Sequence, residues 1–358
     1  MLDLECKDSI FFGYQKKVLT LWRSYDYAPT FIDQPNDSVM TNKERYAQLC
    51  QEYPEINLFM QEWWLSAVCA GKQWDVLFSY DKSGNIQGAL PYLIRKRMLM
   101  RYIIMPQQTQ IGGIWIRPDY ADRSERVKLI TEDLVAQLKQ LHLAYYYQQY
   151  AEGNKTVDAM VEQGFKKRER VSYRIDDLSD MQKIIDSFSK NKKRQLQKAL
   201  SLHVDYQMSD EEFYRFHTLC LRQQKKRISY TREFFLVLAR QSMSRHQGQI
   251  IAIKDEKERT AAAAFVVWDS QQMYYLIPCY SPEFKDSGAG ALLVLEALKL
   301  AQKVTRAFDF EGSMIRGVAN HYKQFGSTPH TYYSIRKYYK PLFAFFTFLN
   351  RISVSRLG

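Results

Sequence analysis

The residues best placed to do chemistry lie near the end of the chain, where a glycine-rich turn connects an apolar strand to a helix. The strand is expected over 273–278, and the helix over 288–304 begins within the turn Lys285-Asp-Ser287-Gly288-Ala289-Gly290. N–H groups at a helix start lack partners, and the helix dipole favours negative charge there. Glycine has no Cβ, so an anion can approach the backbone closely. The turn therefore predicts a phosphate site with the Lys285 charge at its rim; the alternative is a helix cap made by Ser287.

Two carboxylates follow that helix. Asp309 and Glu311 are two residues apart on the next expected strand, so their side chains should face the same side. They alternate with phenylalanines, and a carboxylate is costly to bury in such surroundings. Desolvation would raise the pKa of a general base here and bring it nearer the working pH. The alternative is a structural role, with a carboxylate paired to an arginine such as Arg316 or Arg336.

The composition is that of a globular protein with a basic surplus. The chain has 358 residues, which is comfortable for two domains, and 46% of them are hydrophobic. The formal net charge of +12 favours acidic partners such as nucleotide cofactors, tRNA or anionic membrane surfaces. Basic runs over 190–198 and 222–227 are candidate faces for tRNA or lipid phosphates, and helical spacing aligns Lys190, Arg194 and Lys198. A solvated basic surface is the alternative for each run.

Cysteine and histidine usage predicts neither a disulfide partner nor a metal site. The five cysteines are scattered and odd in number, which argues for a reducing compartment. The chain shows no secretory signal and no stretch apolar enough to span a bilayer. We therefore expect a cytoplasmic protein. The aromatic segment 338–349 leaves open a peripheral attachment to the inner face of the membrane, although it would otherwise pack as a terminal helix.

The periodicity divides the chain into two similar halves after an irregular lead-in over residues 1–38. The first half should contain helices over 41–51 and 58–70, strands over 74–80, 86–95 and 102–117, a helix over 123–141, a strand over 144–150, a short helix over 156–163 and a strand over 165–175. The second half should contain helices over 180–200, 210–224 and 231–245, strands over 203–208, 249–254, 261–268 and 273–278, the helix over 288–304, a strand over 306–310, a short helix over 318–324 and a strand over 330–338. The repeated order indicates a duplication with a mixed α/β sheet in each half, over 39–176 and 177–340, before a C-terminal helix over 341–358.

This order resembles the GNAT N-acyltransferase superfamily, and its duplicated form resembles the FemAB-like peptidyltransferases and their acetyltransferase relatives. The motif Lys285-x-x-Gly288-x-Gly290 is similar to the superfamily's pyrophosphate loop, with lysine where glutamine or arginine is usual. The segment 308–313, followed by His321-Tyr-Lys-Gln-Phe-Gly326, is similar to the ending of the FemAB-like group. Residues 189–199 resemble the basic helix that opens their second domain. The resemblance covers about 39–341 and implies tandem GNAT-like domains.

The resemblance also implies acyl transfer to an amine, with acyl-CoA as the donor and its pyrophosphate held by Ser287 to Gly290. A backbone N–H of the preceding strand, at Ile277 or Cys279, would polarise the acyl carbonyl, because this strand splays from the next one in GNAT-like folds. Pro278 cannot donate to a ladder and is expected to mark the interruption. Tyr322 would protonate the leaving thiolate, with aromatic packing as the alternative.

We expect the donor site in the second half alone, since the first half has no comparable turn at its long helix. The amine acceptor, whose identity the sequence does not give, would bind between the halves. Aminoacyl-tRNA is the alternative donor, although the long helical hairpin often carried by tRNA-dependent FemAB-like enzymes is not evident. A third reading is a non-catalytic binding module.

Overall fold

The computed structural model describes residues 40–69, 74–312 and 316–344, which form a mixed α/β fold around one extensive sheet. The first half, residues 40–176, contains α1 (Asn42–Glu52), η1 (Leu58–Met60), α2 (Glu62–Val68), β1 (Trp74–Tyr80), β2 (Ile86–Arg97), β3 (Met100–Ile104), β4 (Trp115–Ile116), α3 (Pro118–Ala121), α4 (Ser124–Gln140), β5 (Leu143–Tyr150), α5 (Thr156–Glu162) and β6 (Lys166–Ile175). The expected lead-in over 1–38 lies outside the described residues.

The second half, residues 177–344, repeats this plan. It contains α6 (Met181–Ser187), α7 (Lys190–Lys198), β7 (His203–Asp205), α8 (Asp210–Gln223), α9 (Arg232–Ser244), β8 (Gly248–Lys254), β9 (Thr260–Trp268), β10 (Gln272–Tyr280), η2 (Pro282–Phe284), α10 (Ala289–Val304), β11 (Ala307–Asp309), α11 (Arg316–Lys323) and β12 (Thr328–Tyr338). The C-terminal helix expected over 341–358 lies beyond the description from residue 345 onward.

Each half forms an antiparallel meander followed by a parallel crossover. β1, β2 and β3 pair antiparallel, and α4 returns the chain so that β5 lies parallel to β3. In the second half β8, β9 and β10 form the meander, and α10 returns the chain so that β11 lies parallel to β10. The repeated order of strands and helices expected from the sequence is therefore present.

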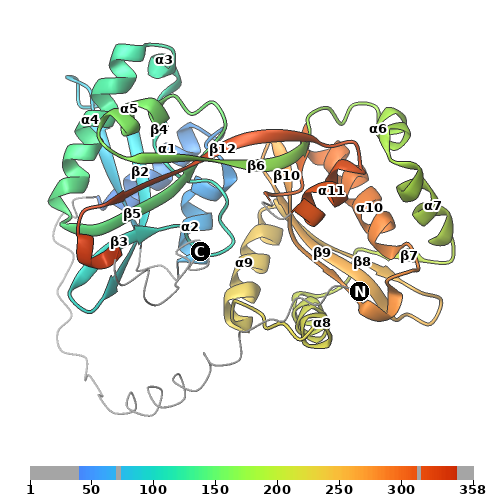
Figure 1. Ribbon diagram of the computed structural model, residues 1–358. Coiled ribbons are helices and arrows are strands. Elements are labelled where there is room, and N and C mark those ends of the chain that lie inside the picture. The colour runs from blue at the N-terminus through green and yellow to red at the C-terminus, as the bar shows by residue number, and fades with distance from the viewer. Residues whose placement is uncertain (1–39, 70–73, 313–315, 345–358) are drawn as a thin grey trace. The chain divides into compact units, whose positions relative to one another are not determined.

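The two halves exchange their last strands, which the sequence did not predict. β12 pairs with β5 of the first half over Tyr333–Tyr338, whereas β6 pairs with β11 of the second half at Arg174 and Ile175. β6 and β12 also pair with each other and run side by side in Figure 1. The resulting strand order is β1-β2-β3-β5-β12-β6-β11-β10-β9-β8-β7, with β4 paired to β2. Because each half completes the other's sheet, the expected division at 176/177 stays a prediction.

Apolar stripes at helical spacing hold the helices on the sheet. On α10 the buried stripe is Leu293, Val294, Ala297, Leu298 and Ala301, as the period predicted, and it packs against the strands of the second half. A further cluster joins the halves, since the ring of Phe59 lies 4.4 Å from that of Tyr274, and Asn57 Nδ2 donates to the Tyr274 hydroxyl over 2.6 Å. The contact fixes η1 of the first half against β10.

Three expected elements are interrupted. The third strand ends at Ile104, and only β4 re-forms near its expected end. The helix expected over 58–70 is η1 followed by α2. The helix expected over 180–200 is α6 and α7, because Phe188 is extended and the Ser189 hydroxyl caps α7 by accepting from the Lys192 N–H. In the described part of the chain, no helix has the length and apolarity to cross a membrane, and no group of His, Cys, Asp and Glu could hold a metal ion.

Candidate functional site

The glycine-rich turn forms the start of α10, as expected. The first reason for a glycine at position 288, however, is helix packing and not phosphate binding. Gly288 has φ +83°, and a Cβ there would lie 2.0 Å from the backbone carbonyl oxygen of Gln195 in α7. The Ser287 hydroxyl accepts from the Ala289 N–H at 3.2 Å, which is the capping role considered for it. The absent side chain at 288 thus lets α7 pack against α10, a structural requirement that holds without any bound phosphate.

The same turn also lines a cavity of about 310 Å³. Lys285, Gly288, Ala289 and Gly290 contribute one wall, Tyr280 of β10 another, and α7 and α11 close the remainder. Lys285 is exposed at the rim, in agreement with its expected position. Four of the residues expected to hold a donor therefore come together around one hollow at a helix N-terminus.

Lys192 of α7 enters this cavity, and sequence reasoning missed it. Its side chain is 3% exposed, and its Nζ lies 3.1 Å from the Gln195 Oε1 and 3.4 Å from the His321 Nδ1. Burial lowers the pKa of Lys192 to about 8, and burial followed by the Lys192 charge lowers the pKa of His321 to about 4. A buried cation surrounded by neutral groups favours an anion in the cavity.

A signal for Lys192 was present in the sequence. Lys192, Leu196 and Ala199 follow the spacing of one helix face, and the latter two are apolar. A lysine on the apolar face of a helix is the anomaly to look for. The residues that were singled out, Lys190, Arg194 and Lys198, are all exposed.

The strand that precedes the turn splays as the resemblance implied. β10 pairs with β11 only over Gln272–Tyr274 and then continues to Tyr280. The register between β10 and β9 is irregular between Tyr274 and Ile277, whereas Pro278 pairs normally with Ala264. Pro278 is therefore not the interruption. Ile277 and Cys279 lie where regular pairing with β9 has resumed. Both side chains are buried, and both residues pair with β9 on one edge of β10.

The two carboxylates occupy different settings. Asp309 ends β11 and is 4% exposed, and its Oδ1 accepts from the Ser172 hydroxyl and, over 2.7 Å, from the Glu311 N–H. Glu311 lies past the strand with φ 62°, so the expectation that both side chains face one side of a strand is wrong. Neither Arg316 nor Arg336 is the partner of Asp309, because a hydroxyl and a backbone amide take that place.

Both carboxyl groups are easier to protonate than usual. Burial raises the pKa of Asp309 to about 6, against the hydrogen bond from Ser172. Burial, followed by the Asp309 charge, raises the pKa of Glu311 well above its ordinary value. The Oε1 of Glu311 is buried without a hydrogen-bond partner. Such an oxygen is available to accept a proton from a bound group.

Glu311 opens onto a second cavity, of about 200 Å³, which lies between the halves. Glu311, Gly312 and Tyr332 line it from the second half. The first half contributes Met105, Pro106, Gln108, Thr109, Gln110, Tyr147 and Gln149. These side chains are uncharged, so Glu311 is the acidic group of the lining.

A series of aromatic contacts leads from the lining of the first cavity to the neighbour of Glu311. The hydroxyl of Tyr280 lies 3.1 Å from that of Tyr275, whose ring centroid is 6.2 Å from Phe310, the neighbour of Glu311. Tyr322 of α11 stacks on Phe310 at 4.8 Å, so aromatic packing accounts for part of its position. Burial, then Glu311, then Asp309 raise the pKa of Tyr322 to about 12, so its hydroxyl keeps its proton near neutral pH.

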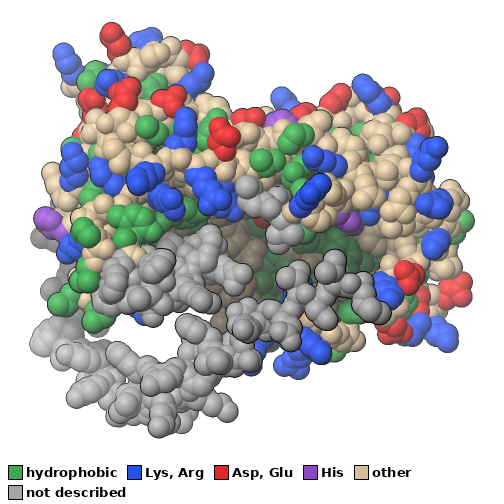
Figure 2. Space-filling view, in the orientation of Figure 1, with side chains coloured by type: hydrophobic (Ala, Val, Ile, Leu, Met, Phe, Trp, Pro, Cys, Tyr) green, Lys and Arg blue, Asp and Glu red, His purple; other side chains and the backbone are tan. Residues whose placement is uncertain are grey.

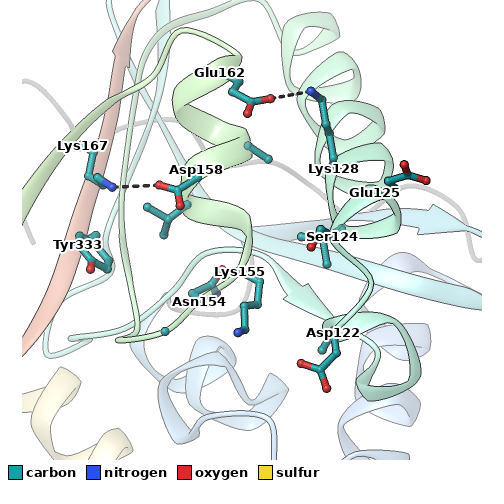
Figure 3. A pocket seen from close by; sticks show the side chains of 15 residues that line it. Asp122, Ser124, Glu125, Lys128, Asn154, Lys155, Asp158, Glu162, Lys167 and Tyr333 are labelled. Atoms are coloured by element: carbon teal, nitrogen blue, oxygen red, sulfur yellow. Dashed lines mark hydrogen bonds and ion pairs between the residues drawn. The ribbon is translucent and has the colours of Figure 1, made fainter.

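The start of α4 is the first-half counterpart of the start of α10, and the charged residues around it differ. A cavity there is lined by the start of α4 and by α5 (Figure 3). Glu162 pairs with Lys128 at 2.8 Å, and Asp158 pairs with Lys167 at 3.0 Å, so two of the three lysines in the lining have carboxylate partners, and Lys155 is the third. Asp122 and Glu125 add further negative charge at the helix start. This lining does not suit a pyrophosphate.

Comparisons with known proteins agree with this architecture. Residues 166–324 match the family model for the acetyltransferase (GNAT) domain. The crystal structure of FemX has a TM-score of 0.63 at 12% identity, covering 82% of this chain and 96% of that chain. L-PGS from Bacillus licheniformis has a TM-score of 0.51 at 12% identity, covering 84% and 93%. The C-terminal domain of a putative lysylphosphatidylglycerol synthetase from Agrobacterium fabrum has a TM-score of 0.54 at 10% identity, covering 82% and 92%.

The search of curated proteins gave no match. The family model confirms the resemblance to the GNAT superfamily over residues 166–324, and the solved structures show that the fold is shared along most of the chain. The family model supports acyl transfer in general as the activity of this part of the chain.

Proposed function

We propose that this chain is an N-acyltransferase that takes an acyl group from acyl-CoA and gives it to an amine bound in the Glu311 cavity. The observation that carries the proposal is Glu311 itself, a half-buried residue whose Oε1 is buried without a hydrogen-bond partner at the wall of a polar cavity. The Lys192 cavity supplies the complementary feature. It combines the N-terminus of α10 with a buried cation, a combination that suits the diphosphate of a CoA donor.

The residues would divide the reaction as follows. Lys192 and the amides of Gly288 and Gly290 hold the donor's phosphates, while the splayed part of β10 offers an N–H of Ile277 or Cys279 to the acyl oxygen. Glu311 removes a proton from the acceptor ammonium, so that the neutral amine can attack the thioester carbon. Tyr322 gives its proton to the departing thiolate as the C–S bond breaks, and it regains a proton from the nitrogen of the new amide. Asp309 orients the backbone of Glu311 and does not take part directly.

Donor binding is the first experiment. A thermal-shift series with acetyl-CoA, CoA and tRNA should show a rise in Tm with acetyl-CoA and CoA, since a ligand that binds the folded state stabilises it. Lys192→Met should reduce the rise at the same ligand concentration. Acylation of a panel of primary amines, followed by mass spectrometry, then tests transfer. Absence of any shift and of any transfer with every donor would favour a non-catalytic binding module.

Aminoacyl-tRNA remains the second candidate donor. The observation in its favour is the exposed face of α7, where Lys190, Arg194 and Lys198 lie on the same helix that sends Lys192 into the cavity. Such a face suits the phosphates of an acceptor stem. A Tm response to tRNA that falls steeply with salt, without a response to CoA, would select this donor.

A further inference from the structure

The hairpin between β2 and β3 ends in two large apolar side chains that project into solvent. Arg97 pairs with Met100 across the hairpin, so Met98 and Leu99 form the turn itself. Met98 is 75% exposed and Leu99 is 90% exposed. The hairpin projects at lower left in Figure 1, and hydrophobic side chains are visible at that place in Figure 2.

These residue types are unfavourable for such a turn in water. Met98 has φ +53°, a conformation in which glycine is favoured at the first position of a tight hairpin turn. Turn residues are also usually small or polar, because they face solvent. Met98 therefore introduces backbone strain at this turn, and both Met98 and Leu99 expose apolar surface to water. Burial of the tip in another apolar phase would account for this choice.

The surroundings of the tip are strongly basic. Lys96, Arg97 and Arg101 flank it, and the chain has no Asp or Glu from residue 82 to residue 118. Arg101 pairs with Leu143 of β5, directly after the exposed His142 at the end of α4. An apolar tip within a ring of cations complements a bilayer that carries anionic headgroups.

The last described turn of the chain adds apolar surface at the same strand. Phe343 packs its ring 5.2 Å from Tyr102 of β3, and its neighbour Leu342 is 57% exposed. A protein partner would need a broad patch of about 800 Å² on each side. A narrow, protruding tip with basic flanks fits a lipid surface better.

We propose that the β2–β3 hairpin anchors this protein to anionic membranes, with Met98 and Leu99 entering the headgroup region and Lys96, Arg97 and Arg101 contacting lipid phosphates. The anchor is independent of the acyl-transfer chemistry, because the hairpin takes no part in either cavity of the candidate site.

Vesicle co-sedimentation of the full chain tests the anchor. We expect the chain to sediment with vesicles of phosphatidylcholine and phosphatidylglycerol, to remain in solution with phosphatidylcholine alone, and to be released by salt. The variant Met98→Gly with Leu99→Ser removes the apolar tip while giving the turn residues it favours. Its membrane affinity should fall by more than about tenfold, with Tm unchanged or raised.

Two further variants separate the contributions. Lys96→Gln with Arg97→Gln should weaken binding to the anionic vesicles and leave Tm near that of the parent. Leu219→Gln removes an exposed leucine of α8, which is 53% exposed and lies outside the hairpin, and this variant should bind as the parent does. Unchanged binding of the Met98→Gly, Leu99→Ser variant would overturn the proposal. So would equal binding to neutral vesicles, or a loss of self-association in that variant, which would assign the hairpin to a protein contact.

Discussion

The backbone N–H of Glu311 donates a 2.7 Å hydrogen bond to Oδ1 of Asp309. This bond turns the chain at the end of β11 into a left-handed conformation, with φ 62° at Glu311. The turn points the second carboxylate at the cavity shared by both halves, where its Oε1 lacks a hydrogen-bond partner. Asp309 is thus held by hydrogen bonds, whereas Oε1 of Glu311 is available to accept a proton.

Replacing Glu311 by glutamine should lower kcat by roughly 10²- to 10⁴-fold, since a general base contributes about that much. The parent enzyme should lose activity as the pH falls through the raised pKa of Glu311, because the base must be ionised. The variant should lack this acidic limb. Initial rates between pH 5 and pH 9 measure both, and unchanged turnover in Glu311→Gln would remove Glu311 from the mechanism.

The same substitution should stabilise the fold at alkaline pH. A carboxyl group whose folded pKa lies above its unfolded value contributes stability below the unfolded pKa and loses it as the pH rises. Glutamine at position 311 carries a neutral amide, so the variant does not lose this stability as the pH rises. Glu311→Gln should therefore show a higher Tm than the parent at pH 8, with a smaller difference at pH 4. A lower Tm at pH 8 would show that the ionised carboxylate is stabilised by a group that remains unidentified.

Removal of the Ser172 hydroxyl should lower the free energy of unfolding of the protein. Ser172→Ala leaves Asp309 with one hydrogen-bond donor fewer in a buried place, at a cost of about 1–3 kcal/mol. The pKa of Asp309 should then rise above its present value of about 6. Urea unfolding at pH 7.5 measures the loss. Asp309→Asn should remove the decline in stability that the parent shows as the pH rises through about 6.

Lys192 should control donor affinity. Lys192→Met should weaken CoA binding by at least about tenfold, since a charge-assisted contact to phosphate is lost. In the parent, affinity should fall as the pH rises through about 8, where the Lys192 ammonium loses its proton. Titration calorimetry at pH 7 and pH 9 gives both values. Lys190→Met, on the exposed face of α7, is the matched control and should bind CoA normally.

Gly288→Ala should cost more than its backbone angle alone. The angle costs about 1–2 kcal/mol for a residue with a side chain, and the approach of the Gln195 carbonyl adds an overlap that α7 must relieve. Gly84→Ala isolates the first term, because Gly84 has φ +81° and open space around its Cβ position. Chemical unfolding of both variants gives the difference. Equal losses of unfolding free energy in the two variants would mean that α7 moves away from residue 288 without an energetic penalty.

Local patterns were sufficient to predict most elements of this fold. β1 occupies 74–80 as expected, and the apolar stripe of α10 follows from the 3.6-residue period of Leu293, Val294, Ala297 and Leu298. The glycine-rich turn was placed correctly at a helix start beside a cavity, because capping and left-handed angles depend on neighbouring residues. Errors occurred where local signals were ambiguous, as at the junction of α6 and α7, where two extended residues, Phe188 and Ser189, break a helical pattern.

The sequence by itself determined the strand and helix order of each half, the position of the glycine-rich turn and the residue types that could act as base and acid. Only the tertiary structure decided which residues meet. The exchange of β6 and β12 joins strands far apart in the chain, and the burial of Lys192 depends on α7 lying against α10. Such long-range contacts depend on the packing of whole elements, so no window of neighbouring residues encodes them.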